Sequence, residues 1–210
     1  MGQRHQIYVF VKNDEGKTVG ACIHHQWLYG MTAGRKALEV LAYAKKAVKD
    51  KYHPFSGGRE GRGLENCLLA LYQLDMKTGG FNSSASHMNY LPTDTAEAEC
   101  VLDPRQGDNN DGITVFDFTD KKHLGYCMVN IREKTDDKSD HSVRQLLPWS
   151  PCTAEEYVRA YYPQKALDKM GVNDRKEFEK LFQASERAWL IGTAELARLF
   201  PAVFNKQAVA

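Results

Sequence analysis

The fold of this chain is decided by the stretch Gly2-Gln3-Arg4-His5-Gln6-Ile7-Tyr8-Val9-Phe10-Val11 and by its partner Thr18-Val19-Gly20-Ala21-Cys22-Ile23-His24-His25-Gln26-Trp27-Leu28-Tyr29-Gly30. Both runs are rich in β-branched and aromatic residues, which favour strands. The residues between them have turn chemistry, and Gly16 suits the positive φ of a short hairpin loop. We therefore expect a β-hairpin around a three-residue loop, Asp14-Glu15-Gly16.

This loop length predicts the pairing register of the two strands. The residues expected to face one another are Val11 and Val19, Val9 and Ala21, Ile7 and Ile23, and His5 and His25. The aliphatic pairs support the register, because they place matching side chains on one face. Tyr8, Phe10 and Cys22 lie on the other face, so the hairpin is apolar on both sides. Such a pattern indicates an inner hairpin that is covered twice.

One end of this hairpin gathers hydrogen-bonding and titratable side chains: Arg4, His5, Gln6, His24, His25 and Gln26. Polar groups in a covered sheet must satisfy one another or a ligand. Histidine titrates near neutrality, so His5 and His25 are candidates for a catalytic acid–base pair, with Arg4 holding an anion. The other three side chains are candidates for ligand binding: Gln6, His24 and Gln26. The alternative is a self-bonded polar plug that closes the sheet.

Length and composition predict one domain. The chain has 210 residues and a formal net charge of +1, which gives no general affinity for nucleic acid or acidic membranes. No linker or repeat divides it, so we expect a single domain over residues 1–210. The five cysteines include no C-x-x-C pair, which fits a reducing compartment. No signal peptide or membrane-length apolar run is evident, so a cytoplasmic location without membrane contact is expected.

The rest of the chain supplies a second hairpin and several helices. Thr32 is a candidate N-cap for a helix that runs to about Asp50. A second hairpin is expected between residues 113–118 and 124–131, around Asp120-Lys121-Lys122. We therefore predict an α+β fold with an antiparallel sheet of at least four strands, made of two hairpins and covered by helices.

The C-terminal third, about residues 153–205, is expected to be helical. Thr153-Ala154-Glu155-Glu156 is a capping box, and Asn173 and Thr193 are candidate N-caps of two later helices. Six apolar residues are assigned to the core rather than to a cofactor site: Phe178, Phe182, Trp189, Leu196, Leu199 and Phe200.

Two loops are candidates for ligand contact. The glycine-rich residues 51–63 carry Arg59 and Arg62, which suit an anion-binding loop, although a plain connection explains them as well. Residues 81–111 are expected to form mostly loop. Near its end, Asp108-Asn109-Asn110-Asp111-Gly112 departs from a calcium loop at the first and last ligand positions, which favours a tight turn. No metal site is assigned.

The segments Gly2-Gln3-Arg4-His5-Gln6 and His24-His25-Gln26-Trp27-Leu28-Tyr29-Gly30 resemble segments of hypothetical proteins encoded by tailed phages and related mobile elements. The resemblance covers mainly the first hairpin. It implies a phage or prophage setting and transfers no catalytic residue.

Three classes of function remain open. The first is a small phage-type enzyme that acts on a nucleotide or nucleic-acid phosphate through His5, His25 and Arg4. The second is a non-catalytic phage inhibitor or virion-associated module that binds a host protein or a nucleotide. The third is a metal site made of His5, His24 or His25 with an acidic residue of the 81–111 loop. His24 and His25 cannot share one ion without a bulge, because adjacent strand residues point to opposite faces. The sequence identifies no cofactor.

Overall fold

The first hairpin forms in the predicted register. The computed structural model describes residues 4–12, 16, 18–26, 28–49, 88–89, 111–120, 122–130, 150–162, 164–186 and 188–201. In it, β1 (Arg4–Lys12) and β2 (Thr18–Gln26) are antiparallel, with His5 opposite His25 and Val9 opposite Ala21. Gly16 in the connecting loop has φ 76°, as its position in a tight hairpin loop requires.

Among the described residues, the sheet has seven strands: six follow the order β3-β2-β1-β4-β5-β6, and β7 also pairs with β5. The further strands are β3 (Met88–Asn89), β4 (Ile113–Asp117), β5 (Gly125–Val129), β6 (Pro151–Cys152) and β7 (Trp189–Leu190). β4 and β5 pair antiparallel, as expected for the second hairpin. β3 lies inside the segment expected to be mostly loop.

The prediction of an antiparallel sheet is wrong, because the sheet is mixed. β1 runs parallel to β4, and β5 runs parallel to β7. The two hairpins therefore meet at the centre of the sheet with parallel strands side by side. Short turns identify antiparallel partners in a sequence, whereas strands joined by a long connection can pair in either direction.

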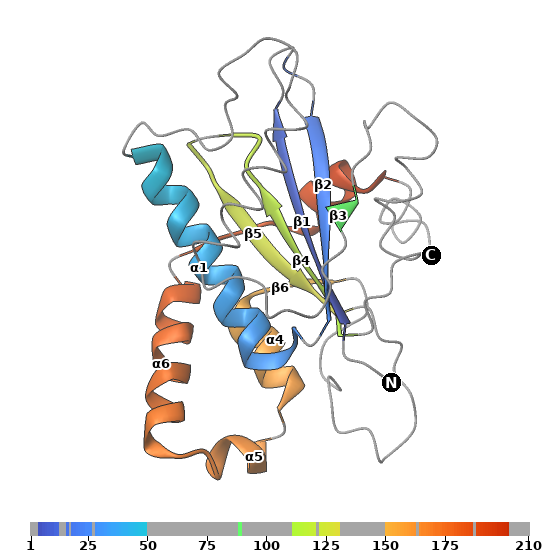
Figure 1. Cartoon of the computed structure of the whole chain (residues 1–210). Helices are drawn as coiled ribbons and strands as arrows, with labels where there is room; N and C mark the ends of the chain where they lie inside the picture. The colour runs from blue at the N-terminus through green and yellow to red at the C-terminus, as the bar shows by residue number, and fades with distance from the viewer. Residues whose placement is uncertain are drawn as a thin grey trace.

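Helices cover both faces of the sheet (Figure 1). The helices in the described part of the chain are α1 (Gly30–Lys49), α4 (Ala154–Tyr161), α5 (Gln164–Asp168), α6 (Val172–Glu186) and α7 (Thr193–Leu199). α1 and α4 lie on one face, and α6 packs against both of them. α7 lies on the opposite face, where it belongs to a second core. None of the helices described is long and apolar enough to cross a bilayer.

The alternation of β1 divides its side chains between two cores. Ile7, Val9 and Val11 are buried with residues of α1 and α4. Tyr8 and Phe10 are buried on the α7 side, where each makes an edge-to-face contact with Phe200. The expectation of a doubly covered inner strand is confirmed for β1.

Helix starts were predicted with mixed success. α4 carries the predicted capping box, in which the Thr153 hydroxyl accepts from the Glu156 N–H and the Glu156 carboxylate accepts from the Thr153 N–H. α1 begins two residues before Thr32, at Gly30, whose φ is 51° and where a Cβ atom would lie 2.6 Å from the Tyr162 hydroxyl. Asn173 and Thr193 also lie inside their helices rather than before them.

Most of the six residues assigned to the core are buried. Phe178, Leu196, Leu199 and Phe200 are buried, and Phe182 is partly buried against the first core. Trp189 is 43% exposed, so its assignment to the core is wrong. It belongs to the two-residue edge strand β7, which leaves one side of the indole uncovered.

Candidate functional site

His5 lies at the start of β1 and is completely buried. Its Nε2 atom is 2.8 Å from the Thr114 hydroxyl oxygen on β4, and its Nδ1 atom is 3.4 Å from the Asp111 carbonyl oxygen. A carbonyl only accepts, so Nδ1 carries the proton in this long hydrogen bond. In the neutral ring, Nε2 then accepts from the Thr114 hydroxyl. The imidazole is thus engaged on both sides within the fold.

Two tyrosines of α4 complete this buried cluster around Asp111. The Tyr157 hydroxyl donates to the Asp111 carbonyl oxygen, and the Tyr161 hydroxyl donates to the Asp111 carboxylate at 3.2 Å. The Tyr157 ring lies edge-on to His5, with 6.0 Å between ring centroids. Burial, followed by the nearby Asp111 carboxylate, raises the pKa of Tyr157 well above its ordinary value. Tyr157 is therefore a neutral hydrogen-bond donor rather than a base.

Gly112 fixes the backbone beside this cluster. Its φ is 101°, and a Cβ atom there would lie 2.7 Å from the carbonyl oxygen of Val129 and 3.2 Å from the Tyr157 ring. Only glycine fits both the positive φ and the close approach. Asp111 and Gly112 are the described part of the turn expected before the second hairpin, and they place the Asp111 carbonyl between His5 and Tyr157.

The other residues predicted for the site are distributed differently. Gln6 is buried on the opposite face of β1, where its amide oxygen accepts from the Tyr8 hydroxyl at 2.9 Å. Backbone pairing places Gln26 opposite Arg4 and His24 opposite Gln6. The side chains of Arg4, His24, His25 and Gln26 lie outside the described part of the structure, as do Arg59 and Arg62. The backbone register pairs His5 with His25 across the two strands, but it does not place the His25 side chain.

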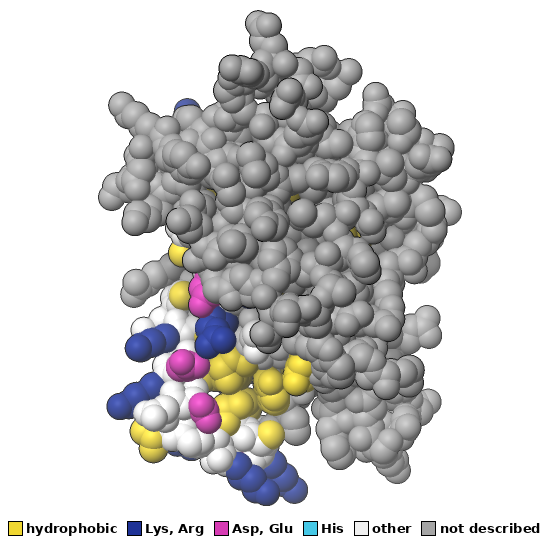
Figure 2. Space-filling view, in the orientation of Figure 1, with side chains coloured by type: hydrophobic (Ala, Val, Ile, Leu, Met, Phe, Trp, Pro, Cys, Tyr) yellow, Lys and Arg dark blue, Asp and Glu magenta, His cyan; other side chains and the backbone are white. Residues whose placement is uncertain are grey.

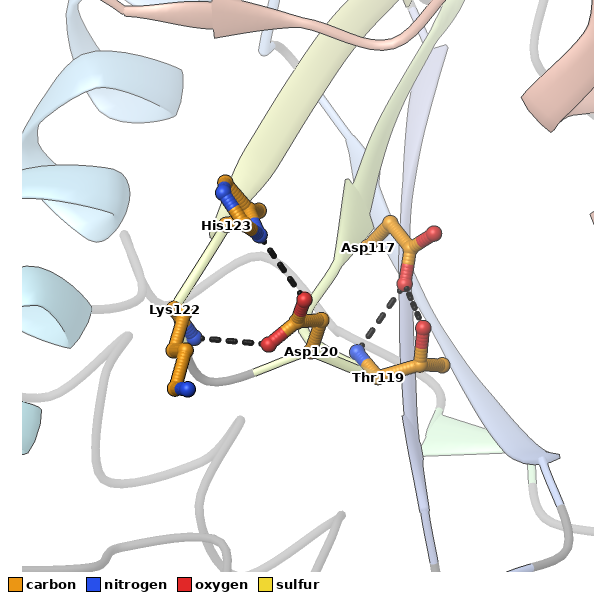
Figure 3. Close-up of polar contacts among 5 residues, drawn as sticks. All are labelled: Asp117, Thr119, Asp120, Lys122 and His123. Atoms are coloured by element: carbon orange, nitrogen blue, oxygen red, sulfur yellow. Dashed lines mark hydrogen bonds and ion pairs between the residues drawn. The ribbon is translucent and has the colours of Figure 1, made fainter.

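A second polar group lies at the turn between β4 and β5 (Figure 3). Asp117 accepts from the Thr119 N–H at 2.9 Å and from the Thr119 hydroxyl at 2.6 Å. Its other carboxylate oxygen forms an ion pair with Arg198 of α7. This buried carboxylate therefore closes the turn and fastens α7 to the sheet.

The tip of the same turn carries an exposed Asp–His pair. The Asp120 carboxylate is 2.8 Å from Nδ1 of His123 and accepts from the Lys122 N–H (Figure 3). These contacts, with the His123 contact the larger, lower the pKa of Asp120. His123 also lies edge-on to the exposed Trp189, at 5.6 Å between centroids. Side-chain bonds of this kind are typical of turns and explain the pair without a ligand.

A hollow of about 360 Å³ lies between α1 and α6. The α1–α6 groove is lined by Met31, Arg35, Leu38, Glu39 and Ala42 of α1 and by Glu177, Lys180, Leu181 and Ala184 of α6. Figure 2 shows apolar side chains exposed in this region, with acidic and basic side chains beside them. The residues recur at three- and four-residue spacing, so each helix contributes one continuous stripe.

Comparison with protein-family models, curated proteins and solved structures found no match. The site must therefore be interpreted from its own geometry. Within the described residues, no group of three or more His, Cys, Asp or Glu side chains is placed to hold a metal ion.

Sequence reasoning identified His5 but missed the residues that bond to it. Asp111 was assigned to a turn and Thr114 to a strand, and Tyr157 and Tyr161 were not among the candidate site residues. The connection depends on the parallel pairing of β1 with β4, which places Thr114 beside Ile7 in the register. One feature of the sequence could have indicated this contact. Side chains alternate between the two faces along β4, so Thr114 lies on the same face as the apolar Phe116. That signal becomes useful only once β1 and β4 are known to be neighbours.

Proposed function

We propose that this protein is a non-catalytic binding module that recognises a helical surface of another polypeptide through the α1–α6 groove. The observation that carries the proposal is the groove itself, an apolar stripe pair with charged edges on the outer helices. Exposed apolar surface with a polar rim is characteristic of protein-binding sites. Two parallel stripes at helical spacing suit a third helix laid between them.

The geometry of His5 supports binding over acid–base catalysis. A general acid or base must reach a substrate proton at hydrogen-bond distance. His5 is fully buried, and its two ring nitrogens face Thr114 and the Asp111 carbonyl. The cluster holds β1, β4 and α4 together, which is the expected role of a satisfied buried network.

Site-specific photo-crosslinking tests the proposal. A benzophenone amino acid would replace exposed Ala184 in the groove or, as a matched control, exposed Ala194 on α7. In cells of the natural source, we expect position 184 to label one polypeptide, identified by mass spectrometry, at a helical segment with an apolar stripe. Ala42→Glu should remove the label. Equal labelling from both positions, or none from position 184, contradicts the proposal.

A second measurement addresses the competing enzyme hypothesis. Wild-type protein would be incubated with a nucleotide and oligonucleotide mixture and compared with His5→Gln and His25→Gln variants that retain cooperative unfolding. We expect no turnover in any sample. Turnover that disappears in a folded histidine variant would overturn the binding proposal.

A further inference from the structure

We infer that the helical surface recognised by the α1–α6 groove belongs to a second copy of this chain, so that the protein forms a two-fold symmetric dimer. This inference rests on the proposed function, since it names the partner of the same groove. Two properties of the groove point to a self-complementary contact: its charge pattern and its small residues.

The charged edge of the groove is balanced. Arg35 and Lys180 are cationic, and Glu39 and Glu177 are anionic. Arg35 lies 3.9 Å from Glu39 and 3.5 Å from Glu177, and each of these side chains is about half exposed. Ion pairs this exposed are weak and exchange readily for partners across an interface.

This balance disfavours a partner with charge of one sign. A uniformly acidic or basic helix would meet as many like charges as opposite ones, and like-charge contacts are costly. A partner surface that also carries two cations and two anions can place each of its charges against an opposite charge of the groove. A two-fold axis supplies such a surface, because the same patch then serves on both sides. The net charge of +1 leaves little general repulsion between copies.

The shape of the groove allows helices to approach one another. Leu38 and Leu181 are largely buried, whereas Ala42 and Ala184 are small and exposed. Interaxial distances between packed helices are set by side-chain size at the contact, about 8–10 Å, and alanine permits the shorter values. A second copy can therefore bring its own α1 and α6 against this face to form a four-helix layer.

The face is small for a protein–protein interface. α6 has 15 residues, which span about 22 Å. Two neighbouring helices, each about 10 Å wide, thus present roughly 440 Å² in projection. Specific interfaces begin near about 600 Å² of accessible surface for each partner. The contact falls below that size, so the dimer should be weak and readily reversible.

Sedimentation velocity of the full chain from about 1 µM to about 300 µM tests the inference, since this range spans a micromolar equilibrium. The weight-average mass should rise from that of the 23.8 kDa chain towards twice that value. Ala184→Glu should raise the dissociation constant at least about tenfold by burying an unpaired charge. Ala194→Glu, the same change on α7, should leave it unaltered.

Charge inversion tests the two-fold arrangement. A chain carrying Arg35→Glu, Glu39→Lys, Glu177→Lys and Lys180→Glu keeps every attraction within a self-dimer but repels the wild-type groove. We expect it to dimerise with itself as the wild type does, and to form few mixed dimers with fluorescently labelled wild-type chain.

Each outcome of these tests has a definite meaning. A monomer throughout the concentration range overturns the dimer, as does a dimer indifferent to Ala184→Glu or free mixing of inverted and wild-type chains. None of these results overturns the proposed binding function, which is tested separately by the crosslinking and turnover experiments above. A foreign polypeptide labelled from position 184 would support binding and reject self-association.

Discussion

At the scale of single residues, His5 is a structural centre. It joins Thr114 on β4 to the Asp111 carbonyl, which also accepts from Tyr157. A buried polar group that loses its partner incurs a desolvation cost that nothing offsets. The side chain that suggested acid–base chemistry is therefore expected to matter most for stability.

We predict that His5→Phe and Thr114→Val each lower the free energy of unfolding by about 1–3 kcal/mol, because each leaves a buried polar partner without its hydrogen bond. The double variant should lose less than the sum of the two single losses, with a coupling of about 0.5 kcal/mol or more. Urea denaturation of the four proteins measures this cycle. Strict additivity would show that the 2.8 Å contact does not couple the two side chains.

At the scale of elements, Asp117 connects a turn with a helix. One carboxylate oxygen closes the β4–β5 turn through Thr119, and the other pairs with Arg198 of α7. α7 has seven residues, which is too few for a helix to be stable alone. Its order should depend on Leu196 and Leu199 in the second core and on this ion pair.

We predict that Asp117→Asn increases amide hydrogen exchange in α7 by about tenfold, while exchange in β1 changes little. The amide keeps an acceptor for Thr119 but removes the charge that holds Arg198, so local opening of α7 becomes easier. Glu155→Gln is a matched control, since it removes a carboxylate that pairs with exposed Arg159 inside α4. Uniform acceleration across the sheet would indicate global destabilisation instead.

The elements also show which features the sequence could predict. The hairpin register followed from a three-residue loop and matching aliphatic residues, and the Thr153 capping box followed from local spacing. These are short-range signals. The parallel pairing of β1 with β4 joins residues more than one hundred positions apart, and no local pattern encodes its direction. The His5 cluster depends on that pairing, so the sequence identified the histidine but not its partners.

At the scale of the whole molecule, three cysteines are free and buried: Cys22, Cys127 and Cys152. Cys67 and Cys100 lie outside the described residues. Burial raises the pKa of Cys22 to about 12 and also raises the pKa values of Cys127 and Cys152 above the ordinary thiol value. The reactive thiolate is thus suppressed while the chain is folded.

We predict that these three thiols react with a disulfide reagent at pH 8 only at the rate of unfolding. The raised pKa values also mean that the folded state holds these protons more tightly than the unfolded state. Stability is therefore fully present below the ordinary thiol pKa of 9.0 and declines as the pH rises above it. Labelling at sub-denaturing urea, followed by peptide mass spectrometry, measures the rates. Rapid labelling of Cys22 in the native protein would refute its burial.

The central pairing of β1 with β4 also determines the order in which the protein can be completed on the ribosome. His5 and Thr114 are 109 positions apart, and chains are synthesised at about 5–20 residues per second. The first hairpin therefore waits roughly 5–20 seconds before β4 can cover its open edge. During that interval β1 has one unpaired edge and apolar side chains on both faces. The nascent chain should be a substrate for ribosome-associated chaperones until residue 117 has emerged.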